Sequence, residues 1–266
     1  MMNTKSLLSC LTAMLLATSI AFADTIAKWT FETNQPAGSP GAGVWITNIA
    51  AEIGTGTAAG WHAGNATYSS VTGNGSAKAF SSQVWGAGDF YQFAVSAIGF
   101  QNLSLTFDIT RSATGPGTFA LQYKTDGATY TPFGANFLIL TNGTGFPSWN
   151  TTTPYGDYAI SFDLSSATAL NNAQVVYFRL VDVTDPTSSS GTLRVDNFLV
   201  SGTPAVLSTL LNIQRSGNNV MLTWSDSAFA LQAAPNATGT YTNVPGAASP
   251  HTESIGDQQK FYRLVR

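Results

Sequence analysis

Residues 103–130 read L-S-L-T-F-D-I-T-R-S-A-T-G-P-G-T-F-A-L-Q-Y-K-T-D-G-A-T-Y, and this stretch decides the fold. Apolar and polar residues alternate from Leu103 to Thr110, and the alternation resumes at Phe119 after a turn that contains glycine and proline. Because a period of two is typical of strands with one buried and one solvated face, the two runs are predicted to form an antiparallel pair. Asp126-Gly127 supplies the positive φ of a tight hairpin turn, so a third strand should follow at once. The stretch therefore predicts an all-β fold.

The same alternation predicts strands elsewhere in the chain. They are expected at 26–32, 158–162, 175–181 and 192–200, with a short helical turn at 164–170. Within 192–200 the apolar parity changes at Asp196-Asn197, which predicts a β-bulge. The segments 35–43 and 54–64 are rich in glycine and are predicted to be loops.

The chain is predicted to have four parts. A signal peptide is expected over residues 1–23 and a jelly-roll-like antiparallel β-sandwich over 24–203. Gly202-Thr203-Pro204 closes that domain, and a linker is expected over 204–209. A smaller pattern of short strands begins at Leu210, which predicts a small immunoglobulin-like or fibronectin III-like β-sandwich over 210–266.

The first residues have the pattern of a secretory signal peptide. Lys5 precedes an apolar run, and Ala21-Phe22-Ala23 matches an A-x-A cleavage site. The run is shorter than the roughly 20 residues of a membrane span, and a short anchor helix is the alternative. Cys10 is the one cysteine, so the mature chain has none and must depend on core packing for stability. We therefore expect a bacterial protein of the extracellular space or cell envelope, with no membrane span after cleavage.

Charge is sparse in this sequence. Eleven Lys and Arg stand against 14 Asp and Glu, for a net charge of −3, and loss of Lys5 with the signal peptide makes it −4. The basic residues are scattered singly, so no nucleic-acid partner is expected. Charged residues are 9% of the chain against a usual value of about 25%. With 12% aromatic residues, the composition predicts a folded, turn-rich β protein.

No residue pattern predicts a catalytic site. A retaining glycosidase needs two carboxyl groups about 5 Å apart, yet Glu32 and Glu52, the two glutamates of the first domain, share no predicted strand. His62 and His251 lie in different domains and have no cysteine partner after cleavage, so both are expected in surface loops. The sequence predicts a protein without enzymatic activity or cofactor, and a polysaccharide hydrolase is the less favoured alternative.

Two acidic positions suggest a structural calcium site. Glu32 ends the first predicted strand, and Asp196 lies on the last strand of the first domain. Because the first and last strands of a jelly roll commonly lie side by side, a hard cation with oxygen ligands would tie them together. The turn Asp182–Asp185 is a second acidic candidate, which is interpreted instead as a solvated turn.

Aromatic residues gather in or beside the predicted loops: Trp45, Trp61, Tyr68, Trp85, Trp149 and Tyr155. An exposed aromatic ring stacks on a sugar ring, whereas buried aromatic plugs at the ends of the sandwich are the alternative. Since a sandwich uses its strand faces for packing and its end loops for recognition, Trp61, Trp85 and Trp149 are the predicted ligand-binding residues. Trp29 and Trp224 are assigned to the cores.

Several motifs resemble known bacterial β domains. The first domain resembles the secreted β-sandwich (jelly-roll) domains of verrucomicrobial and planctomycete proteins, including the PEP-CTERM sorting class, through residues 111–116, 121–127, 162–166, 176–180 and 193–198. Residues 210–266 resemble the fibronectin type III-like C-terminal module of the same bacteria, through residues 215–224, 231–232 and 260–264. A weaker similarity to carbohydrate-binding jelly rolls comes from Phe31-Glu32 and Asp196.

These resemblances imply export and a jelly-roll fold. The final residues, Phe261–Arg266, lack the Pro-Glu-Pro sorting signal, so retention by that route is not expected. Together the observations predict an exported, non-catalytic protein that binds glycan or another surface polymer. A structural or adhesive envelope protein without a small ligand is the alternative.

Overall fold

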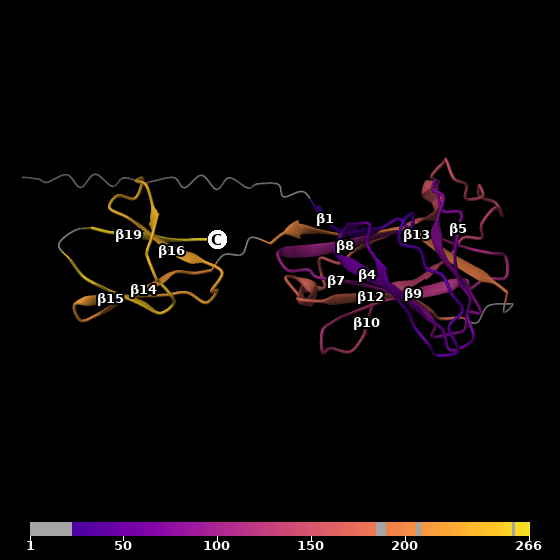
Figure 1. The fold of residues 1–266 in the computed structure, drawn as a ribbon, viewed down its shortest axis with the longest axis horizontal. Helices are drawn as coiled ribbons and strands as arrows, with labels where there is room; N and C mark the ends of the chain where they lie inside the picture. The colour runs from indigo at the N-terminus through magenta and orange to yellow at the C-terminus, as the bar shows by residue number, and fades with distance from the viewer. Residues whose placement is uncertain (1–22, 185–189, 206–208, 257–258) are drawn as a thin grey trace, which may run out of the picture. The chain divides into compact units, whose positions relative to one another are not determined.

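The computed structural model describes residues 23–184, 190–205, 209–256 and 259–266 (Figure 1). The chain divides into two compact units, with the division after Ala205. The predicted signal peptide lies outside the described residues, except for Ala23. Within the described ranges, no helix has the length and apolar character needed to cross a membrane.

The first unit contains two antiparallel sheets, and the predicted all-β fold is confirmed. One sheet has the order β11 (Ala159–Asp163), β8 (Phe100–Arg111), β13 (Thr192–Pro204), β1 (Asp24–Trp29), β3 (Ile53–Gly54); β6 (Ala79–Gln83) also pairs with β13, and β5 (Tyr68–Val71) pairs with β6. The second sheet has the order β10 (Thr131–Leu138), β9 (Thr118–Thr125), β12 (Val176–Asp182), β7 (Phe90–Val95), β4 (Gly56–Trp61), β2 (Ile46–Ala50). Two 3-10 helices, η1 (Gly156–Tyr158) and η2 (Thr168–Leu170), lie between strands of the two sheets.

The predicted pairing of the first two runs is wrong. The strands β8 and β9 form where the alternation places them, but β8 belongs to the first sheet and β9 to the second. Their connection packs closely: Arg111 donates hydrogen bonds to the carbonyl oxygens of Ala113 and Gly115, and a Cβ on Gly115 would lie 2.3 Å from the oxygen of Thr192. The connection crosses between the two sheets instead of closing a hairpin. The third strand is confirmed, because β10 pairs with β9 and Gly127 has φ +71°.

The prediction of a loop over 54–64 is also wrong, since β4 occupies most of it. Its glycines permit close packing on a strand instead of forming a turn. A Cβ on Gly56 would lie 2.7 Å from the ring of Trp29, and a Cβ on Gly60 would lie 2.4 Å from the ring of Tyr68. Trp61, one of the predicted ligand-binding residues, is therefore the last residue of a strand.

The first and last strands of the first unit lie side by side, as predicted. Strand β1 pairs with β13, with Trp29 opposite Phe198. The predicted bulge is confirmed: the register of β13 on β8 shifts after Asp196, and Asn197 has φ +50°. Beyond the end of β1 at Trp29, Phe31 also has a positive φ, +57°, which redirects the chain just before Glu32.

Aromatic side chains from both sheets fill the core between them. The rings of Phe93 and Phe198 stack with centroids 3.5 Å apart, and Trp29 meets both rings edge-on. All three side chains are fully buried, which confirms the assignment of Trp29 to the core.

The second unit contains two three-stranded antiparallel sheets, β14 (Asn212–Ser216), β15 (Asn219–Thr223), β18 (His251–Ser254) and β17 (Thr242–Asn243), β16 (Ala230–Ala234), β19 (Phe261–Val265). Leu222, Trp224 and Leu231 form its buried cluster, and Trp224 is 7% exposed. The assignment of Trp224 to a core is therefore confirmed.

Candidate ligand-binding face

The outer face of the second sheet gathers aromatic, amide and basic side chains. Tyr91 and Phe93 of β7 are buried in the core, so Phe90 and Gln92 point to the other side of the sheet. By the same alternation, Tyr177 and Arg179 of β12 share that outer face. The strands β4, β7, β12 and β9 that carry these residues lie side by side in Figure 1.

Strand register places the outward side chains in rows. Arg179 is paired with Gln92 on one neighbouring strand and with Gln122 on the other. Tyr177 is paired with Lys124, and Trp61 is paired with Phe90. The paired residues have adjacent side chains on one face, as cross-strand partners do.

Arg179 lies at the centre of this face. Its guanidinium carbon is 3.7 Å from the ring centroid of Phe90 and 3.8 Å from that of Tyr130. Its Nε donates a 2.9 Å hydrogen bond to Oε1 of Gln92, which also accepts the hydroxyl of Tyr130. Burial lowers the pKa of Arg179 and raises the pKa of Tyr130 from their ordinary values. The side chain is thus held in place by two rings and one amide.

Two tryptophans extend the face beyond Phe90. The Trp61 ring stacks on Phe90 with centroids 5.5 Å apart, and Trp45 meets Phe90 edge-on at 5.1 Å. Trp61 Nε1 donates to the carbonyl of Gly43, which ties the loop that carries Trp45 to β4. Trp45 is 38% exposed and Trp61 is half-buried, so both rings are accessible to a ligand.

These residues define what we call the aromatic-basic face: Trp45, Trp61, Phe90, Gln92, Gln122, Lys124, Tyr130, Tyr177 and Arg179. Of the three predicted ligand-binding residues, only Trp61 belongs to it. The ligand-binding role of Trp61 remains a prediction.

The structure buries the rings of Trp85 and Trp149, at 4% and 5% exposure. Trp85 packs against the core rings of Tyr91 and Phe119, with centroids 5.0 and 5.4 Å away. Trp149 packs edge-on against Tyr158. The expectation that these two tryptophans present exposed faces is wrong, because Trp85 joins the main core and Trp149 joins a small buried cluster with Ala79 and Tyr158.

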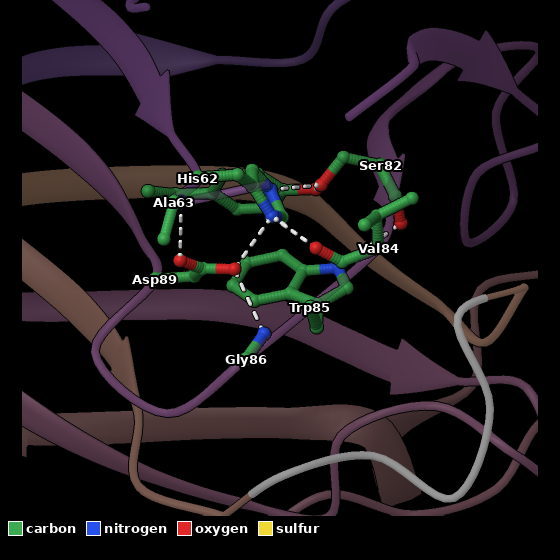
Figure 2. Close-up of polar contacts among 8 residues, drawn as sticks. His62, Ala63, Ser82, Val84, Trp85, Gly86 and Asp89 are labelled. Atoms are coloured by element: carbon green, nitrogen blue, oxygen red, sulfur yellow. Dashed lines mark hydrogen bonds and ion pairs between the residues drawn. The ribbon is translucent and has the colours of Figure 1, made fainter. Parts of the chain in front are cut away.

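His62 lies in a buried polar network and not in a surface loop, so that prediction is wrong as well. Figure 2 shows His62 between Asp89 and Ser82, with the ring of Trp85 beside the imidazole. Nδ1 is 2.9 Å from Oδ2 of Asp89 and 3.0 Å from the carbonyl oxygen of Val84, so Nδ1 carries a proton. Nε2 is 2.9 Å from Oγ of Ser82, which in turn lies 2.6 Å from the hydroxyl of Tyr91.

The order Asp89, His62, Ser82 resembles that of an acid, base and nucleophile. However, each of these three side chains is only 1% exposed, and Tyr91 occupies the other side of the serine hydroxyl. Asp89 also accepts the backbone N–H groups of Ala63 and Gly86, both at 2.8 Å. The network therefore anchors the segments around β4 and β7 and does not face a substrate.

Glu32 and Asp196, the predicted calcium ligands, hold the same segment of chain, Gly73–Lys78. Oε1 of Glu32 accepts the backbone N–H of Lys78 at 2.7 Å. Oδ2 of Asp196 accepts the N–H of Asn74 at 2.9 Å and the hydroxyl of Ser76 at 2.6 Å. Asp196 is fully buried, and this burial raises its pKa to about 6.

The oxygen atoms around Gly73 are of the chemical types that bind a hard cation. A Cβ on this glycine would lie 2.1 Å from Oγ of Ser76, 2.3 Å from Oδ2 of Asp196 and 2.3 Å from the carbonyl oxygen of Lys78. Calcium prefers oxygen ligands, including carboxylate and carbonyl groups. The described residues contain no cluster of three or more His, Cys, Asp or Glu, so hydroxyl and carbonyl oxygens would complete the site. The calcium site remains a prediction.

Calcium is expected to raise the melting temperature of the first unit, because a ligand bound only by the folded state stabilises it. A carboxyl with a raised folded-state pKa holds its proton more tightly when folded. Without a cation, the contribution of Asp196 to stability therefore falls as pH rises from about 4 to about 6. Calcium should thus stabilise the first unit more at pH 7 than at pH 4.

Calorimetry with EDTA and then with excess calcium measures this difference, with Asp196→Asn as the control that should not respond. Equal melting temperatures with and without calcium at pH 7 would contradict the prediction.

The second acidic candidate lies partly outside the described residues, since Asp185 is not among them. Asp182 ends β12 and is 1% exposed, so the interpretation of a fully solvated turn is wrong at this residue. Its Oδ1 accepts the backbone N–H of Thr184 at 3.0 Å, as in an Asx turn.

Sequence reasoning missed most of the aromatic-basic face. Phe90, Gln92 and Arg179 received no functional role, and β7 was not predicted as a strand. The alternation Phe90, Gln92, Ala94 against Tyr91, Phe93, Val95 would have indicated that strand, although both parities contain apolar residues. No sequence signal would have indicated that β7 and β12 are neighbours.

No family model and no curated protein matches the chain. Among solved structures, the K1 cleaved adhesin domain of Lys-gingipain from Porphyromonas gingivalis W83 is 16% identical with a TM-score of 0.39, over 66% of this chain and 97% of that one. The CBM22-1-CBM22-2 tandem domain of Xyn10C from Paenibacillus barcinonensis is 9% identical with a TM-score of 0.40, over 94% of this chain and 86% of that one. The family 11 carbohydrate-binding module from Clostridium thermocellum, in complex with a β-1,3-1,4-mixed-linked tetrasaccharide, is 14% identical with a TM-score of 0.33, over 68% of this chain and 99% of that one.

Similarities this distant carry no argument about what the chain binds. The resemblances to the verrucomicrobial and planctomycete β-sandwich proteins and to fibronectin type III modules remain predictions.

Proposed function

We propose that the first unit is a non-catalytic binding module of an exported bacterial protein, and that it recognises a polysaccharide through the aromatic-basic face. The observation that carries this proposal is the set of half-exposed rings on one sheet face, in register with amide and basic side chains. Aromatic rings stack on the apolar faces of sugars, while amide and guanidinium groups hydrogen-bond sugar hydroxyls. The second unit serves as a small interaction or spacer module.

Polar groups on this face remain available to a ligand. Oε1 of Gln92 accepts two hydrogen bonds, but its amide nitrogen donates to no described residue. Gln122 makes no side-chain hydrogen bond within the described part of the chain. Few fixed polar groups beside larger apolar surfaces are typical of sites that bind small molecules and sugars.

Replacing Trp45 and Trp61 together with alanine is expected to weaken polysaccharide binding about tenfold or more, since each aromatic contact contributes roughly 0.5–1.5 kcal/mol beyond its buried area. Affinity electrophoresis against a panel of soluble polysaccharides, followed by calorimetry on those that bind, measures the effect.

Phe146→Ala is the matched control, because Phe146 is 37% exposed but packs against Tyr158, outside the aromatic-basic face. This variant should bind as the wild type does. If the wild type binds no polysaccharide, or if the double variant binds equally well, the proposal fails. A structural or adhesive envelope protein without a small ligand would then be the better account.

A further inference from the structure

Resting on the proposed function, we infer that the aromatic-basic face selects acidic polysaccharides, with Arg179 and Lys124 binding the carboxylate groups of uronic acid residues. Charge is unevenly distributed on the second sheet. Its six strands contain two basic residues, Arg179 and Lys124, both on the outward face. They contain one acidic residue, Asp182, which is buried and lies on the inward parity. A protein with a net charge of −3 thus presents a positively charged face.

No carboxylate of a described residue forms an ion pair with Arg179 or Lys124. Among the described residues, the ion pairs within 4 Å are His62 with Asp89 and Lys260 with Glu253, and neither involves Arg179 or Lys124. Lys124 Nζ lies 5.0 Å from the ring centroid of Tyr177 and 5.2 Å from that of Tyr130. The exposed carboxylate of Asp126, two residues further on, accepts the N–H of Gly127.

Arg111 shows how this chain uses an arginine for structure. Its guanidinium donates to the carbonyl oxygens of Ile139, Ser112, Ala113 and Gly115, so its hydrogen-bonding capacity goes to the connection it supports. Arg179 differs: its Nε donates to Oε1 of Gln92 and the guanidinium also interacts with the Tyr130 side chain, but no backbone carbonyl of a described residue accepts from it. Two parallel N–H groups at the edge of a guanidinium match the two oxygens of a carboxylate.

The surroundings of Arg179 hold this edge ready for a ligand. The contacts with Phe90, Tyr130 and Gln92 fix the position of the guanidinium before binding, which reduces the entropy cost of capturing an anion. Partial burial of an unpaired cation is unfavourable, and an incoming carboxylate would offset that cost. Lys124 of β9 is paired with Tyr177 of β12, and Tyr177 lies two residues before Arg179 on β12. Both cations are therefore near enough for one polysaccharide chain to contact them.

An acidic protein would satisfy the charges but not the rest of the face. The half-exposed rings of Trp61, Tyr130 and Tyr177 flank the cations and offer flat apolar surfaces to sugar rings. We therefore assign the face to a polyuronate, and binding of an acidic polypeptide becomes an outcome of the test.

The test uses the mature full-length protein with four probes: polygalacturonate, carboxyl-reduced polygalacturonate, dextran sulfate and poly-aspartate. Polygalacturonate should bind at least tenfold more tightly than its carboxyl-reduced form, since hydrogen bonds to charged groups contribute about 1.5–3 kcal/mol. Its affinity should fall as salt increases. Arg179→Gln should weaken that binding about tenfold or more, and Arg179→Lys should restore it only in part, because lysine lacks the guanidinium fork.

Lys28→Gln is the matched control, because Lys28 lies on β1 of the other sheet and its loss removes the same charge. This variant should bind as the wild type does, and all variants should still fold and unfold cooperatively. If dextran sulfate binds and polygalacturonate does not, the assignment to carboxylates is overturned in favour of sulfates. Equal binding of poly-aspartate overturns the assignment to a polysaccharide.

The failure of this inference is distinguishable from the failure of the proposed function. If the carboxyl-reduced polymer binds as tightly and Arg179→Gln has no effect, while loss of Trp45 and Trp61 abolishes binding, the face recognises neutral glycan and only the inference fails. If none of these polysaccharides, nor any in the wider panel, binds, both fail together.

Discussion

Replacing Trp85 with alanine is expected to destabilise the first unit by about 3–5 kcal/mol, as removal of a large buried aromatic side chain does. The ring is 4% exposed and packs against Tyr91, Phe119 and His62. Its Nε1 also donates a 3.1 Å hydrogen bond to the carbonyl oxygen of Ser82. The alanine variant would remove this donor. Thermal and denaturant unfolding of the whole chain, followed in the transition of the larger unit, measures the loss.

Trp45→Ala is the control for this substitution, because it removes the same side chain from a position that is 38% exposed. We expect it to cost clearly less than Trp85→Ala, since the Trp45 ring is already partly exposed and its ring contact is with Phe90 at the surface of the sheet. If Trp85→Ala left stability unchanged and weakened polysaccharide binding, Trp85 would be a ligand-binding residue after all. The packing derived from the structure would then be wrong at this end of the sandwich.

Replacing Asp89 with alanine is expected to cost about 3–5 kcal/mol, as does removing one partner of a buried charged network. Three donors lose their acceptor: Nδ1 of His62 and the backbone N–H groups of Ala63 and Gly86. Because all three partners are donors, Asp89→Asn would turn an amide N–H toward at least one of them and should also destabilise strongly. Denaturant unfolding at pH 7 measures both variants.

Asp157→Ala is the matched control, since Asp157 is exposed and such surface substitutions usually change stability by less than about 0.5 kcal/mol. A loss below about 1 kcal/mol for Asp89→Ala would show that the network contributes little to the fold. It would also reopen the question of whether the Asp89, His62 and Ser82 side chains serve another purpose.

Some of the ligand-binding residues predicted from the sequence are buried, and this outcome has a physical cause. Trp61, Trp85 and Trp149 look equivalent in the sequence, because each stands near glycine or another loop-forming residue. Whether an aromatic side chain near a loop is exposed depends on which distant segments pack over it. Val84, with φ +64°, turns the chain so that Trp85 packs against the core ring of Tyr91.

The sequence by itself determined the local features of the fold. The alternation from Leu103 to Ile109 specified a strand and its buried side, and Asp126-Gly127 specified a turn and the strand after it. The parity change at Asp196-Asn197 specified a bulge. These features depend on residues close together in the chain, so a periodic pattern or a turn pair is enough to predict them.

Only the tertiary structure decided which strands are neighbours and therefore which side chains meet. The period of two says which side of a strand is buried, but it does not name the partner strand, so the assignment of β8 and β9 to different sheets was not predictable. The aromatic-basic face depends on the same information. Trp61, Phe90 and Arg179 come from three strands far apart in sequence, and sheet order and register alone place them together.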